Sequence, residues 1–330
     1  MTTDRQHPRG PLSGLRVLDL TQFLSGPYAT QILADLGADV IKVEAPDGDM
    51  TRRLPPLFVG TQSAYYLSVN RSKRSLAIDM KSDAGRALVR DLALACDIVV
   101  ENFRPGVLAK LGLSYDDIAG QRPGIIWCCI SGFGQDGPYR DRPAYDMIVQ
   151  AMSGGMSLTG EPDGPPVRSG IPLGDISAGM YGVIGILAAI IEKAQTGRGK
   201  LIDVSMLDCQ IAMLSYQAAY FLASGQVPNR QGGGHDSIPT YRCFTCGDGL
   251  DVAITANTER MWIKLCRALG QPGLADDPRF RTNGQRYANR AALWDILETA
   301  FRARPAAAWA DALVAAEVPA AVVNTLDRSL

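Results

Sequence analysis

Histidine is almost absent from this chain, which has only His7 and His235 among its 330 residues. A Ser-His-Asp triad or a Cys-His pair would therefore depend on His235, which disfavours both. The Cys243-Phe-Thr-Cys246 spacing suits zinc, but no second cysteine pair follows it, so a four-ligand metal site is not expected. A carboxylate nucleophile needs no histidine and stays open.

The chain also lacks a charge excess, a long apolar run and a secretory leader. Its net charge is −1, whereas nucleic-acid binders normally show a basic excess. The longest apolar run, Val183 to Ile191, is too short to span a bilayer. The first eight residues are polar, and the seven cysteines are compatible with reduced thiols. We therefore expect a cytoplasmic protein with neither nucleic acid nor membrane as a partner.

Apolar strands alternate with amphipathic helices over the first 130 residues. A strand at Leu15–Leu20 leads into a helix that opens at Gly26-Pro27 and ends at Gly37, and Val40–Val43 is the next strand. The pattern recurs as strands at 74–80, 97–100 and 125–130, with a helix from Ser82 or Asp83 to Ala95. Such alternation predicts an α/β fold with a doubly wound parallel sheet. The first turn has no G-x-G-x-x-G, which disfavours nicotinamide chemistry.

The character of the chain changes after residue 200. A strand at 201–206 and a long helix at 207–224 precede a glycine-rich loop, a hairpin at 241–254, and helices near 260–269 and 290–302. We therefore expect a large Rossmann-like domain at 1–200, a linker helix at 201–225 and a smaller α+β domain at 226–330.

The segment Gly174-Asp175-Ile-Ser-Ala-Gly179 places one carboxylate at the start of a helix that carries no charge from Met180 to Ile191. The local pattern favours Asp175 as the helix N-cap, a position that Asp suits well. The alternative is a carboxylate partly withdrawn from water, with small neighbours where a ligand can approach.

Three further groups of residues have both a binding and a structural interpretation. A basic set near the Arg74 strand suits a nucleotide phosphate, or is a solvated face. Gly232, Gly233 and Gly234 leave backbone amides to bind an oxyanion, or form a flexible loop. The turn Ser131–Tyr139 with Arg140–Asp146 binds a phosphate or thiol group, or only connects two elements. The basic set consists of Arg52, Arg53, Arg71, Lys73, Arg74 and Lys81.

Taken in order, several segments resemble the class III CoA-transferase family, over nearly the whole chain. They are Leu15–Thr21 with Ser25-Gly-Pro27, Leu36–Glu44, Gly48–Arg52, Asn70–Ser75, Glu101–Gly106, Leu158–Gly160, Gly174-Asp175 and Thr196–Gly199. The resemblance implies a Rossmann-like large domain linked to a small one, and a homodimer of two interlocked chains. Family members usually continue beyond the small domain and return to the large one, and we expect this return segment to be absent here.

The resemblance also implies a mechanism and a site. Asp175 would be the nucleophile that forms an aspartyl-CoA thioester, and Gly232, Gly233 and Gly234 would shelter the oxyanion. CoA or acyl-CoA enters as substrate, and no permanently bound cofactor is expected. The implied CoA contacts are Leu24, Ser25, Ile78, Asp79, Met80, Lys81, Asn102, Phe103, Arg104, Lys110, Arg142 and Tyr145.

The predicted function is transfer of CoA from an acyl-CoA donor to a carboxylic acid. The Gly234–Tyr241 segment resembles that of dicarboxylate-using members, which implies succinyl-CoA and a dicarboxylate as substrates. Leu24 replaces a Gln of formate- and oxalate-handling members, which disfavours those acids. One alternative is an α-methylacyl-CoA racemase, but Tyr145 stands where racemases have histidine, and tyrosine with a pKa near ~10 is a poor base at neutral pH. The other alternative is a non-catalytic CoA-binding α/β protein.

Overall fold

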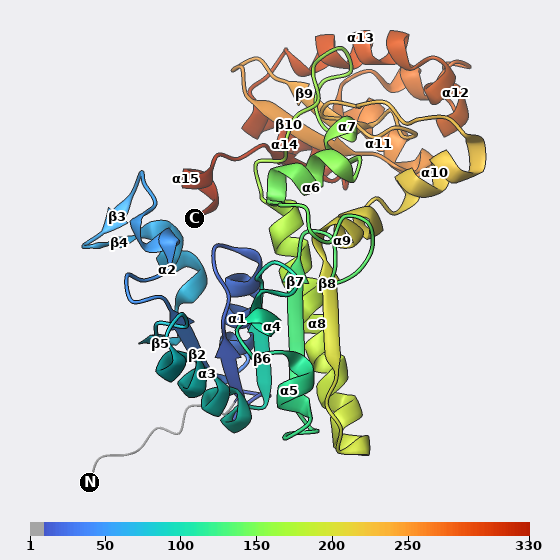
Figure 1. The fold of residues 1–330 in the computed structure, drawn as a ribbon. Helices are drawn as coiled ribbons and strands as arrows, with labels where there is room; N and C mark the ends of the chain where they lie inside the picture. Colours follow the sequence, from blue (N-terminus) through green and yellow to red (C-terminus); the bar gives the residue numbers. More distant parts are fainter. Residues whose placement is uncertain (1–9) are drawn as a thin grey trace. The chain divides into compact units, whose positions relative to one another are not determined.

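A computed structural model describes residues 10–330, so the residues behind the leader prediction lie outside it. The chain forms two compact units (Figure 1). The first unit extends to Ser157 and resumes over Val167–Pro228. The second unit comprises Leu158–Pro166 and Asn229–Leu330. The sequence did not predict that the short 158–166 segment belongs with the second unit.

The first unit is built on a six-stranded sheet of order β5-β2-β1-β6-β7-β8, in which every neighbouring pair is parallel (Figure 1). This confirms the α/β prediction. The strands are β1 (Arg16–Asp19), β2 (Asp39–Glu44), β5 (Arg74–Ala77), β6 (Ile98–Glu101), β7 (Ile126–Ser131) and β8 (Leu201–Ser205).

Helices cover both faces of this sheet because successive strand side chains enter two different cores. Val17 packs in the core with α1 (Ser25–Asp35) and α8 (Leu173–Thr196). Leu18 packs in the opposite core with α3 (Asp83–Ala95), α4 (Val107–Lys110) and α5 (Tyr115–Ala119). Burial on both faces explains why β6 and β7 are apolar without alternation.

The strand predicted at 201–206 is confirmed, but residues 201–225 do not form a linker helix between the units, which corrects that part of the prediction. Leu201–Ser205 is the edge strand β8, and its five residues pair with β7. The following helix is interrupted at Ser215, whose φ of 51° is left-handed, and this divides it into α9 (Met206–Met213) and α10 (Tyr216–Ser224). All three elements belong to the first unit.

Helix α8 is longer than its uncharged stretch suggested. With 24 residues and a mean hydropathy of 1.7, it is long and apolar enough to cross a membrane by length and composition alone. In this structure, however, Ala178, Val183 and Ile186 of α8 lie in the core against the sheet. The helix therefore acts as a core helix of the first unit.

The second unit contains a three-stranded antiparallel sheet of order β11-β10-β9. Its strands are β9 (Tyr241–Thr245), β10 (Asp251–Thr255) and β11 (Ala320–Val322), so the predicted hairpin is confirmed. Helices α11 (Glu259–Ala268), α13 (Arg290–Phe301) and α14 (Ala306–Ala315) pack on it around Trp262 and Phe301.

The remaining short elements of the chain are η1 (Met50–Arg53), β3 (Phe58–Val59), β4 (Gln62–Ser63), α2 (Ala64–Asn70), α6 (Asp146–Met152), α7 (Gly155–Leu158), η2 (Pro272–Ala275), α12 (Asn283–Ala288) and α15 (Leu326–Ser329).

Candidate active site

The strand order predicts where the first unit binds ligands. From β1 the chain first adds β2 and β5 on one side and then β6, β7 and β8 on the other. The switch point of the strand order therefore lies between β1 and β6, at their carboxyl ends. Open parallel sheets bind ligands at such a switch point, in the crevice outside the strand ends. Two cavities are found there, and Gln22 and Phe103 line both of them.

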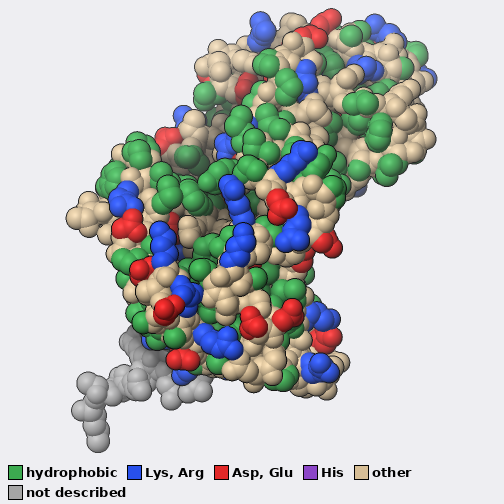
Figure 2. Space-filling model, viewed as in Figure 1, with side chains coloured by type: hydrophobic (Ala, Val, Ile, Leu, Met, Phe, Trp, Pro, Cys, Tyr) green, Lys and Arg blue, Asp and Glu red, His purple; other side chains and the backbone are tan. Residues whose placement is uncertain are grey.

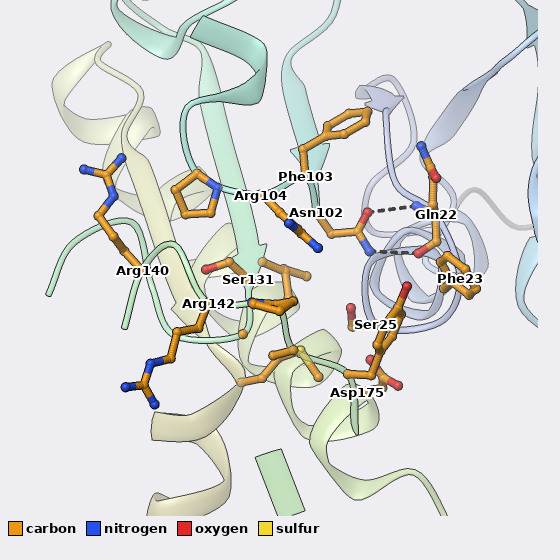
Figure 3. Close-up of a pocket in the computed structure, with 17 residues that line it drawn as sticks. Gln22, Phe23, Ser25, Asn102, Phe103, Arg104, Ser131, Arg140, Arg142 and Asp175 are labelled. Carbon is orange, nitrogen blue, oxygen red and sulfur yellow. Dashed lines mark hydrogen bonds between the residues drawn. The ribbon is translucent and has the colours of Figure 1, made fainter. Parts of the chain in front are cut away.

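The first cavity has a volume of about 240 Å³ and contains Asp175 (Figure 3). Asn102, Arg104 and Arg142 line it from the loops that follow β6 and β7. Ser25 lines it from the start of α1. One carboxylate and several cations thus share one hollow in the first unit.

The second cavity, about 510 Å³, lies beyond the loop after β1. It is lined mainly by apolar groups, with Lys81 and Lys110 at its wall. Eleven of the twelve residues implied as CoA contacts line one or both cavities. Ser25, Asn102, Arg104, Arg142 and Tyr145 line the first, Ile78, Asp79, Met80, Lys81 and Lys110 line the second, and Phe103 lines both. Leu24, the twelfth, lines neither and is buried as the residue that precedes α1.

Asp175 is not the N-cap of α8, which corrects the local reading of the sequence. Pro172 holds the cap position and provides no side-chain cap, and Asp175 lies inside the first turn. Instead, Oδ1 of Asp146 accepts a hydrogen bond of 2.8 Å from the backbone N–H of Gly174. A carboxylate from α6 therefore caps α8 and leaves the Asp175 side chain directed to the cavity.

The two glycines of the Asp175 segment allow close approach by other elements. A Cβ on Gly179 would lie 2.7 Å from the carbonyl oxygen of Ser25, so only glycine lets α1 pack against α8 at this point. A Cβ on Gly174 would lie 3.1 Å from Oδ1 of Asp146. The spacing Gly-Asp-x-x-x-Gly thus serves to place Ser25 and Asp146 beside the carboxylate.

Burial raises the pKa of Asp175 to about 7, and the nearby negative charge of Asp146 adds to the shift. The nearby hydroxyl and backbone N–H of Ser25, and the charge of Arg168, lower the pKa of Asp175 and so act in the opposite direction. The carboxylate is therefore poorly solvated, and its negative charge is only partly balanced by neighbouring groups. Such a group is more basic and more nucleophilic than an aspartate at the surface.

Asp146 is a site residue whose role the sequence did not reveal. Its Oδ2 accepts hydrogen bonds from Gln150 at 2.8 Å and from Nε of Arg168 at 3.1 Å. With the Gly174 bond, these contacts fix a buried negative charge next to the nucleophile candidate. No local pattern could indicate this, because Gly174 is 28 residues from Asp146 in the sequence.

The basic set does not act as a free cationic cluster, which corrects the phosphate interpretation for most of its members. Lys73 and Arg52 form ion pairs with the buried carboxylates of Asp19 and Glu44. Arg53, Arg71 and Arg74 pair with Asp47, Asp35 and Asp39. Figure 2 accordingly shows Lys and Arg side chains interspersed with Asp and Glu on the visible face. Of the six cations, Lys81 is the one that lines either of the two cavities described above.

The turn after β7 lines the first cavity. Ser131, Gly132, Arg140 and Arg142 all contribute to its wall, and Figure 3 shows Arg140 and Arg142 on the same strand-to-helix connection. The Ser131 hydroxyl accepts a hydrogen bond of 3.0 Å from Gly134 N–H, which closes the turn. The connection is thus part of the site, and Arg140 adds a cation that was not in the predicted set of contacts.

The triple-glycine loop belongs to the second unit, and two of its amides are already engaged. The N–H of Gly232 donates to Gly160 O at 3.0 Å, and that of Gly234 donates to Gln231 O at 3.1 Å. Gly232 also needs to be glycine, because its φ is 58° and a Cβ would lie 2.7 Å from Oε2 of Glu161. The expectation of three convergent free amides is therefore wrong for Gly232 and Gly234. Over residues 10–330, no group of three or more His, Cys, Asp or Glu side chains is placed to hold a metal ion.

Comparison with known proteins identifies the family of the chain. CoA-transferase family III matches residues 12–330. The chain is 43% identical over 317 residues to succinyl-CoA:glutarate CoA-transferase of Mus musculus, covering 96% of this chain and 72% of that protein. It is 44% identical over 314 residues to acetyl-CoA:oxalate CoA-transferase of Acetobacter aceti, covering 94% and 80%. Overall identity therefore does not separate glutarate-using from oxalate-using relatives.

A solved structure shares the fold over almost the whole chain. The crystal structure of a CAIB/BAIF family protein from Brucella suis superimposes with a TM-score of 0.87 at 42% identity, covering 97% of this chain and 85% of that one. The parallel sheet and these matches agree. The chain is a member of CoA-transferase family III.

Proposed function

We propose that the protein transfers CoA from an acyl-CoA donor to a carboxylic acid, with Asp175 as the covalent nucleophile. The observation that carries the proposal is the position of Asp175, poorly solvated in a cavity lined by arginines at the switch point of the sheet. The family membership and the names of the relatives support CoA transfer to acids.

The proposed reaction has four steps, which use the same carboxylate twice. Asp175 attacks the thioester carbonyl, the C–S bond breaks, and a mixed anhydride and CoA thiolate form. The thiolate attacks the aspartyl carbonyl of the anhydride, which releases the donor acid and leaves an aspartyl-CoA thioester. The acceptor carboxylate attacks this thioester and expels the thiolate, and the thiolate then attacks the acceptor's carbonyl. Acceptor-CoA leaves and Asp175 is regenerated.

Each tetrahedral intermediate carries an oxyanion that needs a donor. The hydroxyl and N–H of Ser25 lie against Asp175 and are suited to this task. The arginines of the first cavity would balance the charge of an acid substrate.

The substrate pair proposed is succinyl-CoA with a dicarboxylic acid. The test is to incubate the protein with succinyl-CoA and a panel of mono- and dicarboxylates and to follow acyl-CoA formation by mass spectrometry. Dicarboxylates are expected to accept CoA. Exchange with monocarboxylates alone would overturn the substrate assignment, and no exchange with any acid would overturn the function.

The racemase alternative makes a different prediction. A racemase would exchange the α-proton of a 2-methylacyl-CoA with deuterium in D₂O without transferring CoA. Tyr145 lines the same cavity as Asp175, at the start of α6, in place of the histidine that a racemase would use. We therefore expect no deuterium incorporation.

We further propose a cytoplasmic homodimer of interlocked chains, as the family resemblance implies. In support, Ile184, Phe221 and Leu222 of α8 and α10 are 58%, 45% and 81% exposed, as expected for apolar residues that a second chain covers. Sedimentation equilibrium tests this proposal, and a monomer at micromolar concentration would overturn it.

A further inference from the structure

Asn102 joins the two loops that meet at the switch point of the sheet. Its Oδ1 accepts a hydrogen bond of 2.8 Å from the backbone N–H of Gln22, and its Nδ2 donates one of 2.8 Å to the Gln22 carbonyl (Figure 3). The oxygen and the nitrogen of the side-chain amide are therefore both bonded to the backbone of one residue across the crevice. We call this pair of bonds the Asn102 clamp.

The clamp is itself anchored on the side of β6. Oε2 of Glu101, a buried residue at the end of β6, accepts a hydrogen bond of 2.7 Å from the N–H of Phe103. Residues 101 and 103 thus close a turn with Asn102 at its tip. The clamp holds Gln22 against a rigid strand end and not against a free loop.

The residue after Gln22 has a conformation that needs external support. Phe23 has a φ of 63°, in the left-handed region that bulky residues other than glycine rarely adopt. Its ring packs edge-on against Tyr145, with ring centroids 5.7 Å apart. A strained turn of this kind persists only where neighbouring contacts over-determine it, and such turns cluster at active sites.

The strained turn determines where α1 begins. Leu24 precedes the helix and Ser25 is its first residue. Ser25 also lines the cavity beside Asp175, and its carbonyl oxygen lies close enough to Gly179 of α8 that a Cβ there would be only 2.7 Å away. The Asn102 clamp and the Phe23 turn therefore fix the position of Ser25, which lies in the same cavity as the nucleophile candidate Asp175.

We propose that Asn102 is a positioning residue, which acts through the strained Phe23 turn to hold Ser25 against Asp175 and does not act by direct recognition of CoA. This inference rests on the proposed function. It also replaces the expectation that Asn102 serves as a CoA contact. The two roles differ in their kinetics, because loss of a ligand contact raises KM, whereas a displaced Ser25 weakens the chemical steps and lowers kcat.

The test compares Asn102→Ala, Asn102→Asp and Ser25→Ala with the wild type in CoA transfer. Asn102→Asp keeps the acceptor for Gln22 N–H but places an oxygen against the Gln22 carbonyl. We expect both Asn102 variants to lower kcat about 30-fold, within the range expected when a catalytic group is misplaced by about 1 Å, with KM for acyl-CoA changed less than about threefold. Ser25→Ala should lower kcat in the same direction, and combining it with Asn102→Ala should add little.

The pH profile provides a readout that simple loss of stability would not move. Because Ser25 stabilises the ionised form of Asp175, its displacement should move the acid limb of kcat to higher pH. The other charged or titratable groups that face Asp175 are unchanged in these variants. They are Tyr65 of α2, Asp146 of α6 with Tyr145 before it, Arg168, and the cavity residues Arg104, Arg140 and Arg142.

Two results would overturn the inference. The first is a raised KM with unchanged kcat and an unchanged acid limb, which would make Asn102 a direct CoA contact. The second is wild-type kinetics in both Asn102 variants.

Failure of the proposed function can be recognised separately. If the wild type transfers no CoA, amide hydrogen exchange still tests the clamp, because Gln22 N–H is expected to be protected in the wild type and to exchange at least tenfold faster in Asn102→Ala. Equal exchange in the two proteins would overturn the clamp, whatever the activity.

Discussion

Asp19 and Asp175 are two withdrawn aspartates of the same unit, and they have opposite electrostatic surroundings. Asp19 is fully buried at the end of β1, and Asp175 is half-buried at the start of α8. Burial raises the pKa of both carboxyl groups. At Asp19, however, Lys73, Lys42, Thr21 and Thr30 outweigh burial and hold its pKa below the usual range.

The partners explain the difference, because Asp19 is the more deeply buried of the two and still has the lowered pKa. Nζ of Lys73 lies 3.0 Å from Oδ2 of Asp19, and two hydroxyls donate to the same carboxylate at 2.5 and 2.6 Å. Asp175 instead faces the negative charge of Asp146, and the positive charge that opposes it is that of the partly exposed Arg168. A buried carboxylate with full pairing stabilises the fold, whereas one left short of partners is available for chemistry.

The largest expected effect is the loss of activity in Asp175→Asn. The substitution keeps the shape of the side chain but removes the nucleophilic oxygen, so CoA transfer should fall by at least about 10³-fold. Steady-state exchange assays measure this, and CoA affinity by calorimetry serves as the control and should change little. Transfer within tenfold of the wild type would remove Asp175 from the mechanism.

The corresponding change at Asp19 should affect stability. Asp19→Asn leaves Lys73 buried without its charged partner, and we expect a loss of about 3–5 kcal/mol in the free energy of unfolding in urea. Asp39→Asn is the matched control, because its ion pair with Arg74 is exposed and should be worth less than about 1 kcal/mol. Equal losses of unfolding free energy in the two variants would contradict the claim that the buried ion pair of Asp19 stabilises the fold more than the exposed pair of Asp39.

Asp175→Asn should also stabilise the fold, in contrast to Asp19→Asn. The folded state keeps the Asp175 proton up to a pKa of about 7, whereas the unfolded chain releases it near 3.8, so the wild type loses stability as pH rises between these values. The full shift corresponds to about 4 kcal/mol, and partial solvation reduces our expectation to about 2 kcal/mol. Urea unfolding at pH 8 should show the gain. At pH 4 the gain should vanish, and a gain of equal size there would exclude this cause.

Asp146→Asn should move the surroundings of Asp175 toward those of Asp19. An Asn oxygen can still accept the Gly174 N–H, but the negative charge is removed, so the pKa of Asp175 falls. The acid limb of kcat/KM should move to lower pH, and the ratio of activity at pH 6 to that at pH 8 should rise several-fold. An unmoved limb would mean that Asp146 only caps α8.

The smallest effect is expected for cations that already have partners. Arg71→Gln removes a residue that pairs with Asp35, so CoA affinity should stay within about twofold of the wild type. Lys81→Gln removes a cation from the wall of the second cavity and should weaken CoA binding several-fold, most strongly at low salt. Calorimetry distinguishes the two variants. If Arg71→Gln weakens CoA binding more than Lys81→Gln, the assignment of free and paired cations is wrong.

The parallel sheet of the first unit was largely predictable from the sequence, because its strands and the helices α1 and α3 have local apolar patterns and end signals. The apolar run before Gly26-Pro27 and the Ser82 cap of α3 are both in the structure, where the Ser82 hydroxyl accepts from Gly85 N–H. The break at Ser215 was missed, because a single left-handed residue leaves the helical apolar pattern intact.

The site was predictable in its residues but not in its electrostatics. The Gly-Asp-x-x-x-Gly segment and the family resemblance selected Asp175 as the candidate nucleophile. They did not show that Asp146 caps its helix, or that Arg71 pairs with Asp35, which is 36 residues away in sequence. Charge compensation depends on which distant side chains the fold brings together, and periodicity carries no information about that.

The most direct measurement of the central proposal is chemical trapping at Asp175. The wild type is incubated with an acyl-CoA donor and hydroxylamine, digested and mapped by mass spectrometry. We expect a hydroxamate on the peptide that contains Asp175, dependent on acyl-CoA and absent in Asp175→Asn. Continued CoA transfer with no modification of Asp175 would contradict the covalent mechanism.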